Sequence, residues 1–457
     1  MKHKTIIEPF RIKAVEPIHF STKEERSNYL NDVNFNLFGL NSEQVTIDLL
    51  TDSGTSAMSS QQWAALMEAD ESYAGSKSWI RLKKIIKKMT GFSYIFPTHQ
   101  GRAAEYLLFS IIGGKGKTFL SNTFFDTTRA NVEASGAKAI DCPVTKNNLQ
   151  DYEKHFMGNM DLEVLEKQLK NKIAGVILTV TNNSVGGQPV SLSNAIQVKA
   201  LCRAYDVPLY LDACRIAENA YFVKHFEPNF INYSAAEIAL QFCRLSDGVL
   251  MSAKKDGLVN MGGFFATDNK RLNNYFRDRL ILKEGYVSYG GMSGRDLEAM
   301  ATGLEEVFDE DYLQYRMAST NYLGMGLKKI GVPVLYPTGG HAVYVDAQAL
   351  YPHIPPEEFP GQVLACELYR FGGIRSCEIG SVMFGHYNTK KQFVPAAQEL
   401  LRLALPRRVY TMSHLDYVIE TFEFLKLNAP KTVGLRMTHR ARQMPHFTAT
   451  FKKVIED

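Results

Sequence analysis

Two adjacent lysines stand in the stretch MSAKKDG at 251–257, directly after an apolar run at which a buried strand is expected to end. A lysine at the mouth of a sheet can form a Schiff base with an aldehyde when burial disfavours its ammonium form. A second ammonium group beside it has the same effect. Lys255 is therefore the candidate for a covalent bond to a cofactor. Lys254 is the neighbouring charge that favours the neutral amine, and Ser252 offers a hydroxyl to a phosphate.

Residues earlier in the chain could complete a pyridoxal phosphate site around this lysine. Asp212 ends the preceding predicted strand, where its carboxylate could pair with a pyridinium nitrogen and make the ring an electron sink. Gln100, Gly101 and Arg102 come just before a helical pattern. The N–H groups of a helix start, together with a guanidinium group, suit a phosphate. Phe125 is the candidate to stack on the cofactor ring.

Three short apolar runs predict buried strands, at 174–181, 207–212 and 248–252. Helical patterns at 161–170 and 194–205 alternate with them, which indicates an α/β domain with a mostly parallel sheet. Such sheets bind ligands at the carboxyl ends of their strands. Polar candidates at three successive ends favour one shared site over the alternative, in which the aspartate caps a helix and the lysines are solvated. The glycine pairs do not form the GxGxxG pattern of a dinucleotide site.

The pattern beyond residue 310 differs from that of the preceding part. A long helical stretch at 311–330 is followed by further strands and helices. We therefore expect three parts. They are an N-terminal arm at 1–45 that packs on the small domain or on a neighbouring subunit, a large cofactor-binding domain at 46–310, and a small C-terminal domain at 311–457.

Composition and charge argue against several classes of protein. Hydrophobic residues make up 45% and charged residues 22% of the chain, the balance of an ordinary globular protein. A formal net charge of +4 gives no case for a nucleic-acid partner, and the basic stretch at 79–89 has the spacing of an amphipathic surface helix. No apolar run approaches the roughly 18 residues of a membrane span. We expect no signal peptide because the first residues are too polar, and six scattered cysteines suit a cytoplasmic protein with free thiols.

Taken together, these motifs resemble one family, the β-eliminating lyases. The matching stretches run from the N-terminal arm to near the end of the chain, and SAKKDG and THQGR are the most specific among them. They are IDLLTDSGT (47–55), ADESYAGS (69–76), PTHQGRAAE (97–105), FFDTT (124–128), NSVGGQPVS (183–191), SAKKDGLVNMGG (252–263), SYGG (288–291), GGHAVYVDA (339–347) and LPRRVYT (405–411).

The resemblance implies a pyridoxal 5′-phosphate enzyme of fold type I, the aspartate-aminotransferase-like fold. In that fold a large domain with a mostly parallel sheet accompanies a smaller α+β domain. The resemblance also implies a homotetramer that is activated by a monovalent cation, K⁺, and that acts on a small-molecule amino acid.

Several roles toward the cofactor follow from the resemblance. Lys255 matches the Schiff-base lysine, Asp212 the partner of the pyridine nitrogen, and Arg215 its neighbour near the ring oxygen. The phosphate-binding positions and the stacking ring are matched by Gln100, Gly101, Arg102, Ser252 and Phe125.

Other roles concern the substrate and the cation. Asn183 and Arg402 match the residues that hold the substrate α-carboxylate. Tyr73 matches a tyrosine that serves as general acid across a subunit interface. The potassium-binding positions are matched by Gly54, Glu71 and Asn260.

Some members of this family release phenol from tyrosine, and others release indole from tryptophan. Where the phenol-releasing members place a threonine, an arginine and a phenylalanine around the ring, this chain has Asp126, Ile379 and His446. An arginine can hold a phenol oxygen, whereas indole has no such oxygen and its N–H needs an acceptor. The resemblance therefore implies β-elimination of L-tryptophan to indole, pyruvate and ammonia.

Other functions remain open at this point. A phenol-releasing enzyme, or a lyase acting on cysteine or serine, shares the reaction class, and Arg129 is closer to the phenol-releasing pattern. An aminotransferase would need a 2-oxo acid and would return an amino acid instead of ammonia. The non-enzyme alternative is a cofactor-binding protein without turnover, and the lysine, the aspartate and the carboxylate-binding arginine argue against it.

Overall fold

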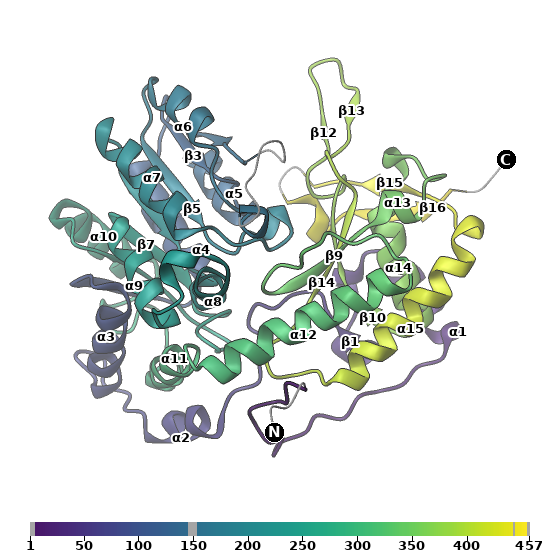
Figure 1. The fold of residues 1–457 in the computed structure, drawn as a ribbon, viewed down its shortest axis with the longest axis horizontal. Helices are drawn as coiled ribbons and strands as arrows, with labels where there is room; N and C mark the ends of the chain where they lie inside the picture. The colour runs from purple at the N-terminus through teal and green to yellow at the C-terminus, as the bar shows by residue number, and fades with distance from the viewer. Residues whose placement is uncertain (1–4, 145–152, 442–443, 455–457) are drawn as a thin grey trace. The chain divides into compact units, whose positions relative to one another are not determined.

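The computed structural model describes residues 5–144, 153–441 and 444–454, and Figure 1 shows their helices and strands. The chain forms two compact units: a large unit of residues 53–316, and a small unit that joins residues 1–52 to residues 317–457. The unit boundaries lie a few residues beyond those expected from the sequence. The N-terminal arm belongs to the same unit as the C-terminal part of the chain.

A seven-stranded sheet forms the centre of the large unit, with the strand order β2-β8-β7-β6-β5-β3-β4. The strands from β7 to β4 run parallel, whereas β8 is antiparallel to both of its neighbours. The bounds are β2 Tyr94–Thr98, β3 Thr118–Ser121, β4 Lys138–Asp141, β5 Gly175–Thr179, β6 Leu209–Asp212, β7 Gly248–Ser252 and β8 Gly263–Thr267. The predicted apolar runs thus supply the three central strands β5, β6 and β7.

Helices cover both faces of this sheet, because successive strand residues point to opposite sides and both sets are apolar. Tyr210, Leu250 and Phe265 pack with α4 and α10, whereas Leu211 and Val249 pack with α7, α8 and α9. The helices of this unit are α2 Ser60–Glu68, α3 Lys77–Thr90, α4 Gly101–Ile112, α5 Asp126–Ala134, α6 Leu162–Leu169, α7 Leu192–Ala204, α8 Ile216–Phe226, α9 Ala235–Leu245, α10 Lys270–Lys283 and α11 Gly294–Glu306.

The helix α3 has the amphipathic character that the sequence predicts. Its N-terminal cap is Ser76, whose side chain accepts a hydrogen bond from the Trp79 N–H, and it ends at Gly91 in a left-handed conformation. Trp79, Leu82 and Ile86 are buried on one face, while the lysines of the helix are exposed.

The small unit contains a three-stranded antiparallel sheet in the order β11-β14-β9, beside three two-stranded pairs. Its strands are β1 Ile47–Asp48, β9 Ala342–Asp346, β10 Ile374–Arg375, β11 Cys377–Ile379, β12 His386–Tyr387, β13 Phe393–Val394, β14 Leu400–Ala404, β15 Leu435–His439 and β16 Thr450–Lys453. Its helices are α1 Lys23–Asp32, α13 Ala347–Leu350, α14 Pro360–Gly372 and α15 Met412–Asn428, and α12 Glu310–Lys329 runs from the large unit into it.

The N-terminal segment is held to this small unit by side-chain and backbone hydrogen bonds. Arg26 of α1 donates to the carbonyl oxygens of Arg370 and Phe371 at 2.9 and 2.8 Å, and the Thr46 N–H donates to the Gly373 carbonyl at 2.9 Å. The strand β1 then pairs in parallel with β10.

Two buried residues other than glycine have a left-handed backbone just beyond the strands of the large sheet. Thr181 follows β5 with a φ of 48°, and Leu258 follows the turn after β7 with a φ of 54°. Among the described residues, no helix is long and apolar enough to cross a membrane.

Candidate active site

A cavity lies at the carboxyl ends of β6 and β7 and beside the start of α4, wholly within the large unit. The structure brings eight predicted residues to it: Gln100, Gly101, Arg102, Phe125, Asp212, Ser252, Lys254 and Lys255. The parallel strands explain this convergence, because their carboxyl ends meet at one edge of the sheet.

Lys255 is buried in the turn that follows β7, with 8% of its surface exposed. Its Nζ lies 5.8 Å from the centre of the Phe125 ring. The next residue fixes the turn, because the Asp256 carboxylate accepts hydrogen bonds from the N–H groups of Ala217 at 2.7 Å and Glu218 at 3.3 Å. Asp256 therefore caps the start of α8, and the lysine is attached to a rigid element.

The start of α4 packs directly against the end of β7. A Cβ atom on Gly101 would lie 2.8 Å from the Ser252 Cα and 2.9 Å from its nitrogen, so only glycine fits there. The approach is fixed by the Gly262 N–H, which donates to the His99 carbonyl at 2.8 Å. The first N–H groups of the helix thus lie beside a serine hydroxyl, which is an arrangement suited to a phosphate.

The charges in the cavity suit an anionic cofactor. Three basic side chains, Lys254, Lys255 and Arg102, line one small volume. Burial, followed by the positive charges of Lys255 and Arg102, therefore lowers the pKa of Lys254. Asp212 supplies the opposite charge, and its carboxylate accepts a hydrogen bond from the Cys214 N–H at 3.2 Å. A lysine, an aspartate, an aromatic ring and a phosphate cradle are the groups that pyridoxal phosphate requires, and the residues present fit it.

Six described residues that line the cavity were not identified as site residues from the sequence. They are Ser53, Glu105, Thr127, Cys214, Leu250 and Met251. Burial, followed by the nearby Asp212 carboxylate, raises the pKa of the Cys214 thiol. Glu105 had a usable signal, since it is the one charged residue in the mostly apolar stretch 103–112.

Arg215, Asn183 and Asp126 belong to the same unit but are not among the described residues that line the cavity. Arg215 precedes α8, and its carbonyl accepts a hydrogen bond from the Thr181 hydroxyl at 3.1 Å. Asn183 begins the short 3₁₀ helix Asn183–Val185 and is buried. Asp126 is the first residue of α5, where its carboxylate accepts a hydrogen bond from the Thr127 N–H at 2.6 Å.

Tyr73 lies in the loop between α2 and α3, away from the residues that line the cavity, and 68% of it is exposed. Its ring stacks on that of Tyr286 at 5.8 Å and meets that of Tyr289 edge-on at 5.2 Å. Its neighbour Glu71 accepts a hydrogen bond from the Gly294 N–H at the start of α11, at 2.9 Å.

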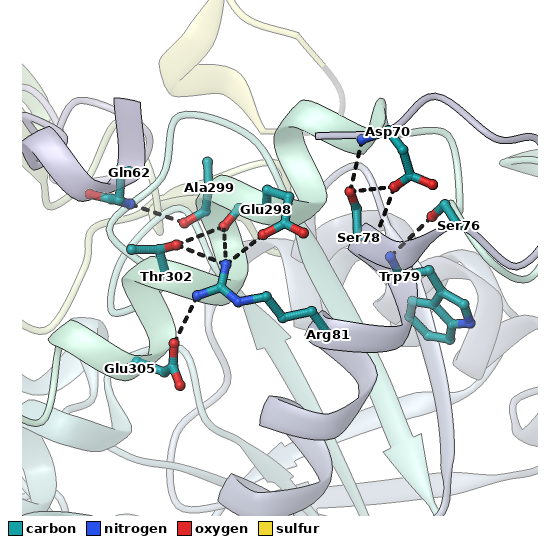
Figure 2. Close-up of polar contacts among 10 residues, drawn as sticks. All are labelled: Gln62, Asp70, Ser76, Ser78, Trp79, Arg81, Glu298, Ala299, Thr302 and Glu305. Carbon is teal, nitrogen blue, oxygen red and sulfur yellow. Dashed lines mark hydrogen bonds and ion pairs between the residues drawn. The ribbon is translucent and has the colours of Figure 1, made fainter. Parts of the chain in front are cut away.

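The loop that carries Tyr73 is anchored at its base, as Figure 2 shows. Asp70 accepts hydrogen bonds from the N–H and the hydroxyl of Ser78 at 2.9 and 2.8 Å. One turn further along α3, Arg81 binds the carboxylates of Glu298 and Glu305 on α11 at 2.5 and 2.9 Å. The loop therefore leads into a helix, α3, that is fastened to α11.

The three residues expected to bind potassium fall into two groups of contacts. The Asn260 side chain donates to the Gly54 carbonyl at 2.9 Å, and the Gly54 N–H donates to the Lys254 carbonyl at 2.7 Å. Glu71 has its contacts with α11 instead, including Arg295 at 3.4 Å. Within the described residues, no group of three or more His, Cys, Asp or Glu side chains could hold a metal ion.

The remaining predicted residues belong to the small unit. Arg402 of β14 donates to the Leu50 carbonyl at 2.9 Å, and β14 pairs with β11, which carries Ile379. His446 lies in the 3₁₀ helix Pro445–Phe447 and is buried against the Phe38 ring, at 5.9 Å between centres. Met444 precedes that helix with a left-handed backbone, φ 47°.

Comparisons with known proteins identify the family and the fold of the chain. A family model described as "Beta-eliminating lyase" matches residues 48–421. A tryptophanase from Salinibacter ruber is 54% identical over 97% of this chain and 95% of its own length. A tyrosine phenol-lyase from Pasteurella multocida is 43% identical over 97% of this chain and 98% of its own length. The fold is similar to that of a serine palmitoyltransferase from Sphingomonas wittichii, with a TM-score of 0.60 at 14% identity, covering 90% of this chain and 97% of that one.

Proposed function

The chain belongs to the β-eliminating lyase family, and from that membership we propose that it converts L-tryptophan into indole, pyruvate and ammonia with pyridoxal phosphate as cofactor. The reaction class comes from the family. The choice of tryptophan is supported by the higher identity to the tryptophanase than to the tyrosine phenol-lyase.

The observation that carries the proposal is the cavity in which Lys255 and Asp212 meet beside a phosphate cradle. The start of α4, the Ser252 hydroxyl and the cations Arg102 and Lys254 would bind the cofactor phosphate. Phe125 lies near the Lys255 amine and would hold the cofactor ring by stacking.

Pyridoxal phosphate, when bound, supplies an electron sink for the electron pair of the broken Cα–H bond. Lys255 would hold the cofactor through its aldehyde group, and its freed amine would take the Cα proton of the substrate. Asp212 would hold a proton at the ring nitrogen. Arg215 would act on the ring oxygen, and Asn183 and Arg402 would bind the substrate α-carboxylate.

Release of indole needs a second proton, because the indole anion is a poor leaving group. Tyr73 delivers this proton to the ring carbon that is bonded to Cβ, while Asp126, Ile379 and His446 orient the indole ring. The exposed position of Tyr73 on its own unit supports action in the site of a neighbouring subunit. We accordingly propose a homotetramer whose active sites are completed by partner chains.

The proposal also includes a potassium site and the cellular location of the enzyme. The Gly54 carbonyl, Asn260 and Glu71 bind K⁺, and the hydrogen bond between the first two supports their grouping. Because the Gly54 N–H also bonds to the Lys254 carbonyl, cation binding orders the lysine turn. We propose that the enzyme acts in the cytoplasm.

A product assay tests the proposed function. The protein is incubated with pyridoxal phosphate, K⁺ and, in turn, tryptophan, tyrosine and cysteine, and indole, phenol, sulfide and pyruvate are measured. We expect indole and pyruvate in equal amounts from tryptophan. Phenol as the main ring product would instead identify the phenol-releasing activity, sulfide alone would identify a cysteine lyase, and no pyruvate from any substrate would overturn the proposal. Replacing K⁺ with Na⁺ should lower the rate.

A further inference from the structure

Glu105 is a buried carboxyl that the proposed reaction does not use. It lies one helical turn after Arg102 on α4, is buried, and lines the cavity together with Asp212 and Lys255. A carboxyl in such a place is costly unless it is hydrogen-bonded or kept neutral.

All the side-chain donors to Glu105 come from α5. Its two oxygens accept hydrogen bonds from Thr128 at 2.5 Å, from Thr127 at 2.9 Å and from Asn131 at 3.2 Å. The helix α5 begins directly after Phe125, the ring that lies 5.8 Å from the Lys255 amine. The carboxyl of Glu105 therefore fastens the first turn of α5, and with it the aromatic wall of the cavity, to α4.

Opposing effects act on the pKa of Glu105. Burial, followed by the Asp212 carboxylate, raises its pKa to about 7, against the opposing effects of the threonine hydrogen bonds and of Lys255. The other charged or titratable groups that line the cavity are Arg102, Lys254 and Cys214. On α5 itself, Arg129 turns away to bind Asp141 and Glu133. An ionised Glu105 thus places a second negative charge beside Asp212.

We propose that Glu105 is a positioning residue whose neutral form holds α5 and Phe125 in place for the cofactor, and whose ionisation loosens the hold of the cavity on that anionic cofactor. The inference rests on the proposed cofactor but concerns a residue outside the proposed reaction. It requires no partner chain, since every group named lies in the large unit.

The test compares the wild-type apo-protein with Glu105→Gln, which keeps an acceptor oxygen and never ionises. The dissociation constant for pyridoxal phosphate is measured by absorbance titration between pH 6 and pH 8.5, without substrate. Relative to the variant, the wild type should lose about tenfold in affinity as the pH rises through 7, since a pKa change of one unit corresponds to tenfold in binding. Equal pH profiles for the two proteins would overturn the proposal.

A second comparison tests the positioning role. Glu105→Ala removes all the hydrogen bonds to α5 and should weaken cofactor binding even at pH 6, where Glu105→Gln binds like the wild type. Thr128→Val serves the same purpose if the alanine variant does not unfold cooperatively on heating. Wild-type affinity at pH 6 in whichever of the two is used would overturn the positioning role.

A matched control separates this inference from the proposed function. Glu133→Gln changes an exposed carboxyl of α5 that pairs with Arg129, and it should reproduce the wild-type pH profile. If the wild-type protein binds no pyridoxal phosphate at all, the proposed function fails. If it binds the cofactor and a Glu105→Gln profile matches it, only the inference fails.

Discussion

Glu105 in the large unit and Glu378 in the small unit are both buried carboxyls, yet their surroundings differ. Glu105 shares a cavity with Lys255, Lys254 and Arg102. Glu378 instead faces a second carboxyl, Glu399, across Gly380, where an added Cβ would lie within 2.7 Å of an oxygen from each.

In both surroundings, burial is the main cause that raises the pKa of the carboxyl. Burial, followed by Glu399, raises the pKa of Glu378 well above its ordinary value, and burial raises the pKa of Glu399 to about 7. The donors around this pair include the Val382 N–H and the N–H and hydroxyl of Ser381. Among the described groups with the largest effects on the pKa of Glu378 there is no cation, whereas Lys255 opposes the raised pKa of Glu105. Burial alone therefore does not mark a reactive site; an open volume lined with opposite charge does.

Lys255→Ala should have the largest effect, because it removes from the cavity of Glu105 the amine on which turnover depends. Without the amine, turnover should fall by at least about 100- to 10,000-fold, and borohydride reduction should leave no pyridoxyl label on the 251–257 peptide. The cavity would also lose a charge that opposes the raised pKa of Glu105. Indole release and peptide mass measure the outcome, with exposed Lys87→Ala as control. A labelled peptide in the variant would remove Lys255 from its role.

Arg316→Met tests how much a directly paired cation stabilises a buried carboxylate. The buried carboxylate of Glu218 lies 3.0 Å from the Arg316 guanidinium, and both side chains are almost wholly enclosed. Leaving that carboxylate without its cation should lower the free energy of unfolding by about 3–5 kcal/mol. Urea unfolding measures it.

The control for this variant is an ion pair at the surface. Lys224→Met removes the pair with Glu310, whose side chains are partly exposed, and should cost less than about 1 kcal/mol. Equal losses in the two variants would show that enclosure does not set the value of the cation.

Glu399→Gln tests the carboxyl pair through the pH dependence of stability. Because the folded form binds its proton up to about pH 7 and the unfolded chain releases it near 4.5, the folded form holds more protons between these values. Stability of the wild type should therefore fall as the pH rises from about 4.5 to about 7. In the variant, the free energy of unfolding should fall less over this pH range, by up to about 3 kcal/mol. Urea unfolding at pH 5 and pH 8 measures it, and the same change in stability with pH in the wild type and the variant would contradict the prediction.

Asp70→Ala should have the smallest effect and the opposite sign of pH dependence. Hydrogen bonds, led by that from the Ser78 N–H, hold the pKa of this surface carboxylate well below its ordinary value. The stability that it contributes is thus present at neutral pH and is lost in acid. The variant should lose about 1 kcal/mol at pH 7, measured by urea unfolding, and Asp70→Asn should recover part of it. An unchanged stability would mean that Asp70 does not hold the loop.

The sequence could predict the parallel strands and the residues at their ends for a physical reason. A strand covered on both faces reads as an unbroken apolar run, so the positions of β5, β6 and β7 are visible in the chain, and so are Asp212 and Lys255 just beyond them. The family resemblance is confirmed by the family model and the relatives. The roles of the individual site residues stay predictions.

Other features depend on contacts that one sequence does not display. The antiparallel direction of β8 is decided by the short turn after the lysines. Glu105 and Thr127 line the cavity because α4 and α5 lie side by side, which no local pattern encodes. The division into units also depends on long-range packing, since the N-terminal segment joins residues more than three hundred positions away through Arg26.

The left-handed residues near the site have a consequence for anyone who wishes to make the protein more robust. Such a backbone in a residue other than glycine stores roughly 1–3 kcal/mol of strain. Yet the Leu258 side chain fills the core, and the Thr181 hydroxyl holds the chain before α8. Glycine would relieve the strain, but at 258 it would open a void and at 181 it would remove the donor to the Arg215 carbonyl. The strain at these two positions therefore cannot be removed by glycine without losing core packing or a hydrogen bond.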